Sequence, residues 1–120
     1  MIKNVAKVGV YVRDQQRALD FFTQVLGFEV ISDELMGPDG RWIEVRPPGG
    51  QTALALWTPP GLEDRIGTFS GIVFTCEDVH ATYEELRQRG VKFTQEPVKQ
   101  PGGVMGVFVD PDGNSFVLRD

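Results

Sequence analysis

The sequence lacks several features that would assign it to a structural class at once. It has one cysteine and one histidine in 120 residues. One cysteine excludes an internal disulfide, and one histidine excludes the multi-histidine ligand sets of many metal sites. No apolar run approaches the roughly 18 residues of a membrane-spanning helix. The N-terminus enters a strand pattern without the layout of a signal peptide, so we expect a cytoplasmic protein with no membrane partner.

Positive charge is also scarce. Lys and Arg together number 12 against 17 Asp and Glu, which gives a net charge of −5. A chain of this charge has no broad positive field to hold phosphate backbones, and this excludes nucleic acid as an expected partner. The 41% hydrophobic and 24% charged residues are otherwise ordinary for one globular domain.

A strong turn signal near the C-terminus has a weaker counterpart earlier in the chain. Pro, Asp, Gly and Asn in residues 110–114 favour a tight turn between the apolar runs 106–109 and 115–118. Residues 47–50, Pro-Pro-Gly-Gly, separate two similar runs. The two hairpins predict an internal repeat.

The repeat extends to the rest of each half. Asp14 corresponds to Asp78 at an offset of 64, and Gly27 corresponds to Gly90 at an offset of 63. In each half the Asp can cap a helix with apolar residues at helical spacing, and the Gly can end it. One-residue insertions account for the changing offset.

These signals predict an α+β fold of two tandem βαβββ modules, at about residues 1–58 and 69–120, joined by a linker at about 59–68. The expected strands are 7–12, 28–32, 42–46, 53–57, 71–76, 91–94, 105–109 and 115–119, with helices over 15–26 and 79–89 and loops over 33–41 and 96–103. Each module is too small for a sizeable core, so we expect a single domain. One face of each sheet lies under a helix, and the two uncovered faces form a curved mixed sheet around a shared concave cavity.

Alternation along the strands predicts which side chains face this cavity. The candidate ligand-binding residues combine flat aromatic rings, apolar side chains and a few charges: Lys7, Tyr11, Trp42, Glu44, Arg46, Trp57, Phe69, Met105, Val107 and Arg119.

The duplicated pattern resembles the vicinal oxygen chelate superfamily, which includes glyoxalase I, extradiol dioxygenases and bleomycin resistance proteins. The resemblance covers almost the whole chain. It rests on motifs in a fixed order, namely Val10–Asp14, Ala18–Phe22, Val25–Phe28, Glu77–Val79 and Phe108–Asn114. It implies the fold more specifically than any activity.

Enzymes of that superfamily bind a divalent metal through the first and fourth strand of each module. The corresponding positions here hold Lys7, Ala55, Gly71 and Val117. None is a metal ligand, because metals need imidazole, thiolate or carboxylate groups. We therefore expect no metal and no other cofactor. His80 lies early in the second helix, where we expect a solvated side chain.

Two functional readings follow, and the sequence leaves both open. The first is a metal-free binding protein that sequesters an aromatic or cationic antibiotic-like ligand, as bleomycin resistance proteins do. Trp42 and Trp57 would stack on a planar ligand, although both could instead serve packing or a subunit interface.

The second reading is an enzyme. Lys7 is the best catalytic candidate for a metal-free isomerase, epimerase or lyase, with Tyr11 or Glu44 as its proton partner. The alternative for Lys7 is an ion pair with Glu44. A glyoxalase-type or dioxygenase-type metalloenzyme is a weaker third possibility. By resemblance we also expect a homodimer.

Overall fold

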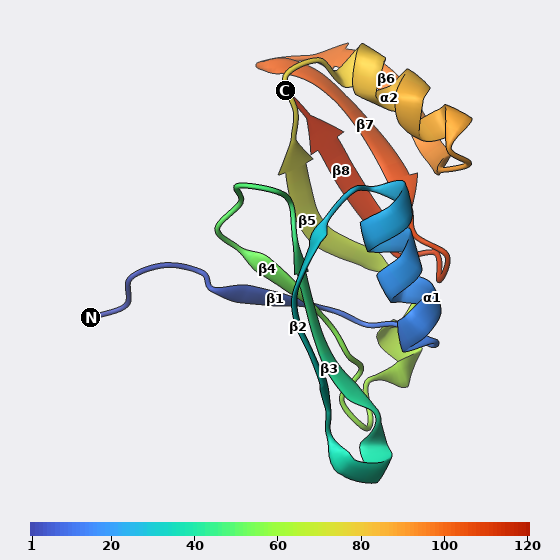
Figure 1. Ribbon diagram of the computed structural model, residues 1–120. Helices are drawn as coiled ribbons and strands as arrows, with labels where there is room; N and C mark the ends of the chain where they lie inside the picture. The colour runs from blue at the N-terminus through green and yellow to red at the C-terminus, as the bar shows by residue number, and fades with distance from the viewer. The chain divides into compact units, whose positions relative to one another are not determined.

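The chain divides at its midpoint into two compact units. In the computed structural model, which describes residues 1–120 apart from the side chain of Asp39, the units are Met1–Ile66 and Gly67–Asp120. Each has the element order βαβββ, as the repeat predicts, so the α+β class is confirmed (Figure 1). The boundary lies inside the predicted linker. That the two units form one domain around a shared cavity stays a prediction.

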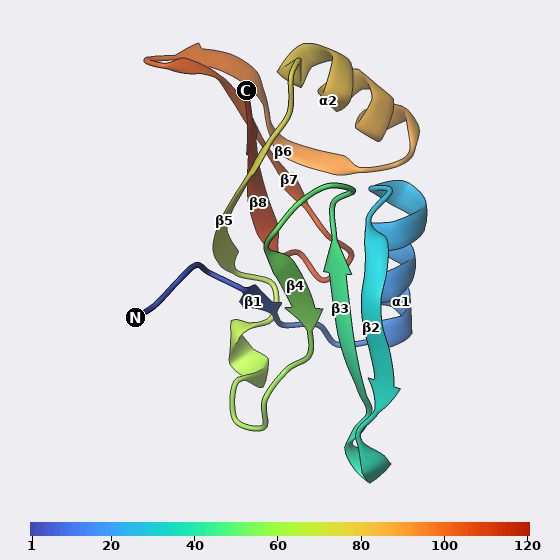
Figure 2. The ribbon, with the colours of Figure 1, turned by 60° about the vertical axis from the view of Figure 1, so that its left-hand side comes forward.

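The first unit contains a four-stranded mixed sheet in the order β1-β4-β3-β2. Strand β1 runs parallel to β4, and the other pairs are antiparallel (Figure 2). The helix α1 continues directly into a π-helical turn, η1. The elements are β1 Lys7–Val10, α1 Gln15–Asp20, η1 Phe21–Val25, β2 Glu29–Leu35, η2 Gly37–Asp39, β3 Arg41–Arg46, β4 Ala53–Leu56 and η3 Glu63–Arg65.

The second unit repeats this topology. Its sheet has the order β5-β8-β7-β6, again with the first strand parallel to the last. The elements are β5 Phe69–Thr75, α2 Val79–Gln88, β6 Lys92–Gln100, β7 Gly103–Val109 and β8 Ser115–Arg119. No described helix has the length and apolar character needed to cross a membrane.

Matching signals begin and end the two helical segments. The Asp14 side chain accepts a hydrogen bond from Arg17 N, and the Asp78 side chain accepts one from Ala81 N, each at 3.0 Å. These bonds satisfy backbone donors that the first helical turn leaves unpaired. At the other end, Gly27 and Gly90 have φ of 79° and 91°, a conformation that favours glycine.

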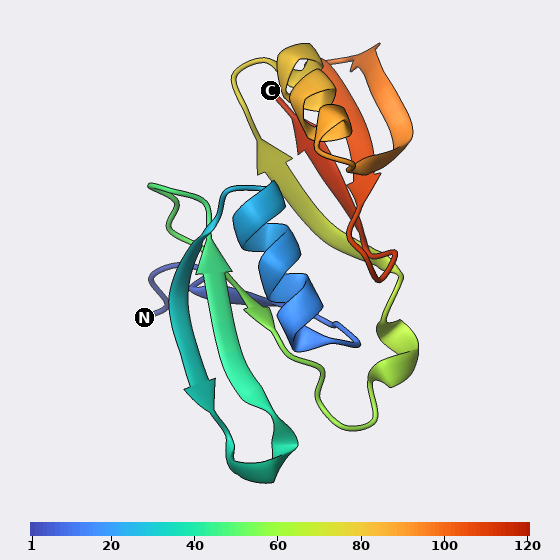
Figure 3. The ribbon, with the colours of Figure 1, turned by 45° about the vertical axis from the view of Figure 1, so that its right-hand side comes forward.

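Each helix covers one face of its own sheet, and the core of each unit lies between that helix and that sheet (Figure 3). In the first unit Phe22, Ile43 and Leu56 are fully buried. In the second, Phe108 and Phe116 are buried with ring centroids 5.5 Å apart. Because the buried apolar residues alternate along β3 and along β7–β8, the side chains between them, including that of the buried Glu44, lie on the opposite faces.

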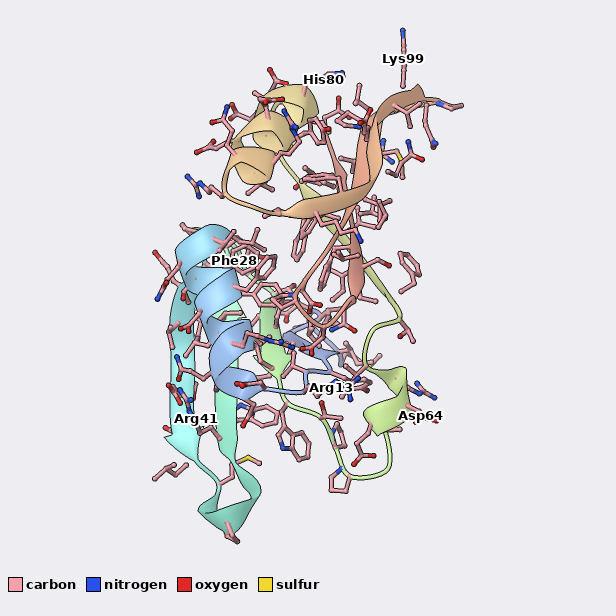
Figure 4. All side chains as sticks on the ribbon, turned by 90° about the vertical axis from the view of Figure 1, so that its right-hand side faces the viewer. Arg13, Phe28, Arg41, Asp64, His80 and Lys99 are labelled. Atoms are coloured by element: carbon pink, nitrogen blue, oxygen red, sulfur yellow. The ribbon has the colours of Figure 1, made fainter. Side chains whose placement is uncertain are left out.

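Two strands extend well into predicted loops. Strand β2 extends to Leu35, into the predicted loop 33–41, and β6 extends to Gln100, into the predicted loop 96–103. β6 can continue as a strand past Pro97 because it lies at the edge of the sheet, where the missing N–H of a proline removes no essential hydrogen bond. Pro97 also lies at a register shift between Gln95 and Val98. Lys99 therefore projects from a hairpin strand (Figure 4).

Candidate functional site

The face of the first sheet opposite α1 carries a cluster of aromatic and charged side chains. Lys7 comes from β1, Trp42 and Glu44 come from β3, and Trp57 directly follows β4. The register places Lys7 opposite Ala53 and Glu44 opposite Ala55, so β4 lies between the other two strands. Four of the predicted site residues are thus brought together within one unit.

Glu44 is at the centre of this cluster. Its Oε2 accepts a hydrogen bond from Trp42 Nε1 at 2.6 Å and lies 3.0 Å from Lys7 Nζ. The Glu44 side chain is only 9% exposed, whereas that of Lys7 is 50% exposed. The hydrogen bond from Trp42 lowers the pKa of Glu44, and Lys7 lowers it further, while burial opposes both. Glu44 is therefore held as a carboxylate by two donors on one oxygen.

The two tryptophans form an aromatic surface beside this carboxylate. The rings of Trp42 and Trp57 lie 5.8 Å apart at 54°, and Lys7 Nζ lies 5.8 Å from the centre of the Trp42 ring. These distances fit a favourable aromatic pair and a cation–π contact. The orientation of the Trp42 ring is fixed by the hydrogen bond from its Nε1 to Glu44 and by the contact of its face with Lys7.

Small residues form the floor next to the aromatic surface. Ala53 and Ala55 are the β4 residues on this face, and Gly9 lies opposite Ala55 on β1. A Cβ at Gly9 would lie 3.3 Å from Cε1 of Tyr11, so the Tyr11 ring folds back over this glycine. Gly9, Ala53 and Ala55 therefore add little side-chain bulk to this face, both alanines are buried, and the Tyr11 ring lies against Gly9.

The β3 end of the face contains a buried donor. Arg46 Nε is buried and has no hydrogen-bond partner among the described residues. Its cross-strand neighbour on β2 is Glu29, which is exposed.

Sequence reasoning missed the contribution of β2 to this face. The β2–β3 register pairs Glu29 with Arg46, Ser32 with Glu44 and Glu34 with Trp42, with a shift between Val30 and Ser32. The shift changes which side chains face outward, and the polar composition after Ser32 was interpreted as a loop. Exposed carboxylates at Glu29 and Glu34 therefore border the cluster.

The predicted site residues of the second unit lie on the corresponding face of the second sheet. Met105 pairs with Arg119, and Val107 pairs with Val117. Phe69 is 64% exposed on β5. Arg119 is engaged locally, because its Nη2 donates to Gly102 O at 3.0 Å. That these four residues share a ligand with the first-unit cluster stays a prediction.

The residues at the superfamily's metal-ligand positions do not fit a metal. Of Lys7, Ala55, Gly71 and Val117, only Lys7 has a polar side chain, and its ammonium pairs with Glu44. Across the described residues there is no group of three or more His, Cys, Asp or Glu that could hold a metal ion. His80 is exposed on α2, as expected for a solvated helix residue (Figure 4).

Comparison with known proteins places the chain among proteins of one superfamily. The model of the Glyoxalase/Bleomycin resistance protein/Dioxygenase superfamily matches residues 4–118. The chain is 40% identical over 120 residues to the uncharacterized protein YetH of Bacillus subtilis, covering 100% of both. It is 29% identical over 115 residues to lactoylglutathione lyase of Escherichia coli O157:H7, covering 89% of this chain and 84% of the lyase.

Among solved structures, the chain is similar to TnmS3, an antibiotic binding protein from Streptomyces sp. CB03234. The TM-score is 0.83 at 35% identity, and the match covers 98% of this chain and 95% of TnmS3.

Proposed function

Because the chain belongs to the Glyoxalase/Bleomycin resistance protein/Dioxygenase superfamily, we propose that it binds and sequesters an aromatic, antibiotic-like small molecule. The observation that carries the proposal is the Trp42–Trp57 pair beside a floor of Gly9, Ala53 and Ala55. The similarity to an antibiotic binding protein supports it independently.

The tryptophans suit a planar ligand. A ring that stacks on an indole gains about 0.5–1.5 kcal/mol beyond the burial of apolar area. Gly9, Ala53 and Ala55 add little side-chain bulk beside the indoles, and both alanines are buried. A core-packing role would bury both rings completely, whereas both tryptophans remain partly exposed.

A cationic ligand has less support. The buried carboxylate that would receive a cation is Glu44, and both of its donors come from the protein itself. The aromatic part of the expectation is therefore the better supported part.

A catalytic role for Lys7 also has less support. A Schiff-base nucleophile or general base needs an unpaired amine in an apolar surrounding. Lys7 instead forms the ion pair with Glu44 that the sequence offered as the alternative to catalysis, and half of its side chain is exposed. The similarity to lactoylglutathione lyases does not support a metal-dependent reaction, because the superfamily's metal-ligand positions hold Lys7, Ala55, Gly71 and Val117 in this chain.

We further propose that the chain forms a homodimer in the cytoplasm and contributes to antibiotic resistance. The dimer predicts a solution mass near twice the 13.3 kDa of the chain. Light scattering coupled to size exclusion tests it, and a mass of one chain would contradict it.

The function is tested by tryptophan fluorescence. The purified protein is titrated with planar aromatic antibiotics and small keto acids, and each compound is quantified afterwards by chromatography. Saturable quenching with full recovery of the compound supports sequestration. Trp42→Ala and Trp57→Ala should each weaken binding, by about three- to tenfold for one lost stacking contact.

Consumption of a compound would instead support an enzyme. If Lys7→Met then abolished consumption while affinity was retained, Lys7 would be the catalytic residue and sequestration would be wrong. If no aromatic compound bound, the proposed function would fall altogether.

A further inference from the structure

We infer that the ligand of this site is an uncharged aromatic molecule, and that the Lys7–Glu44 pair determines this selectivity. The inference rests on the proposed function, because it specifies the ligand of the same sheet face. It is carried by the 3.0 Å contact between Lys7 Nζ and Glu44 Oε2 and by the 2.6 Å hydrogen bond from Trp42 to the same oxygen.

The pair removes the attraction of either charge for a ligand. An anion at the Lys7 ammonium is repelled by the Glu44 carboxylate, which lies 3.0 Å from Lys7 Nζ. A cation at Glu44 is repelled by the Lys7 ammonium in the same way. A charged ligand would therefore lose hydration without gaining a full counter-charge, and this loss disfavours its binding. An uncharged ring loses little hydration and still gains the stacking contact.

The rest of the face does not restore a net attraction for ions at the cluster. The next positive charge on this face is Arg46, which the register sets opposite the exposed Glu29 without an ion pair between the two, and its Nε is buried. Glu34 faces Trp42 from the exposed β2 strand, where water screens its charge. Selectivity then depends on the one buried acid and its partner.

The experiment uses three anthracene derivatives that share one ring system and differ in charge. They are 9-anthroate, 9-anthracenemethanol and 9-anthracenemethylammonium, titrated by calorimetry at pH 7 and 0.15 M salt. The wild-type protein should bind the uncharged alcohol at least about fivefold more tightly than either ion, since an incompletely compensated buried charge costs more than this.

Variants of the pair should reverse the preference in opposite directions. Glu44→Gln leaves the Lys7 ammonium without its partner, so the affinity for anthroate relative to the alcohol should rise about tenfold, as expected for one charge-assisted contact. Lys7→Met leaves Glu44 without its cation, so the methylammonium compound should gain by a similar factor. The double variant should again prefer the alcohol.

Glu34→Gln is the matched control, because it removes the same charge from the same face without touching Lys7. It should change the ratios by less than about twofold, as screening at this salt requires. A general loss of folding cannot produce opposite changes in selectivity, so the two single variants separate selectivity from stability.

The outcomes distinguish this inference from the function on which it rests. If the alcohol binds but neither single variant changes the order of the three compounds, or if an ion binds best to the wild type, the inference is wrong and aromatic binding stands. If none of the three compounds binds the wild type, both are wrong.

Discussion

Replacing Glu44 by Gln should destabilise the first unit by about 1–2 kcal/mol at pH 7. The change keeps an oxygen that can accept from Trp42 Nε1, but it turns a charge-assisted hydrogen bond into a neutral one, which loses about 1 kcal/mol. The ion pair with Lys7 adds less than about 1 kcal/mol, because half of the lysine side chain is exposed. Glu44→Ala should cost about 1–2 kcal/mol more, since it leaves the Trp42 N–H without its partner.

The same prediction has a pH dependence of defined sign. The pKa of Glu44 in the folded chain lies below its ordinary value of 4.5, so the folded state favours the carboxylate. Its contribution to stability is complete above pH 4.5 and disappears as the pH falls through the lowered pKa. The difference between the wild type and Glu44→Gln should therefore shrink as the pH is lowered from 4.5 towards 3.

Urea unfolding followed by tryptophan fluorescence measures this difference, because both tryptophans lie in the first unit. With a typical urea dependence of about 1–3 kcal/mol per M, the midpoint should fall by roughly 0.5–1 M at pH 7. Equal midpoints at pH 7 would refute the stabilising role of the carboxylate. A difference that stays constant down to pH 3 would refute its electrostatic origin.

Three further predictions concern single residues. Arg46→Met should leave the free energy of unfolding unchanged or raise it by up to about 1 kcal/mol in thermal unfolding, because the substitution removes a buried donor that has no partner. A loss of stability above about 1 kcal/mol would show that a water molecule accepts from Arg46 Nε. Gly9→Ala should weaken binding of 9-anthracenemethanol about three- to tenfold with little change in stability, since the new Cβ presses on the Tyr11 ring; unchanged affinity would place Tyr11 outside the site. Asp110→Ala should lower the free energy of unfolding in urea by about 3 kcal/mol, because the Asp110 carboxylate accepts from Asp112 N, Asn114 N and Asn114 Nδ2 at 2.9 Å each. A loss of stability below about 1 kcal/mol would contradict this role.

Local chemistry made most of the fold predictable. The Asp14 and Asp78 caps, the Gly27 and Gly90 ends and the Asp110–Asn114 turn are signals carried by single residues, and the structure contains each of them. The faces of Lys7, Trp42 and Glu44 followed from alternation, and the structure brings the three together because β1 and β3 both pair with β4.

The remainder depended on information that the sequence does not carry locally. The register shift after Val30 and the edge position of β6 arise from pairing with neighbouring strands, and the polar residues there read as loops. The hydrogen bond from Trp42 to Glu44 also depends on side-chain rotamers, which parity does not specify.

The π-helical turn η1 shows how the two repeats of this chain differ in length and still share a topology. Thirteen positions separate Asp14 from Gly27, whereas twelve separate Asp78 from Gly90. Leu26 N bonds to Phe21 O, five residues back, so one turn of the first helix is wound wide enough to hold an additional residue. A sequence alignment of the two halves needs a one-residue gap at this point, whereas the helical backbone continues through it without a break. The inserted residue is absorbed between a cap and a stop that both remain in place, and the offset between the two halves is 63 both at Gly27 and at Val45.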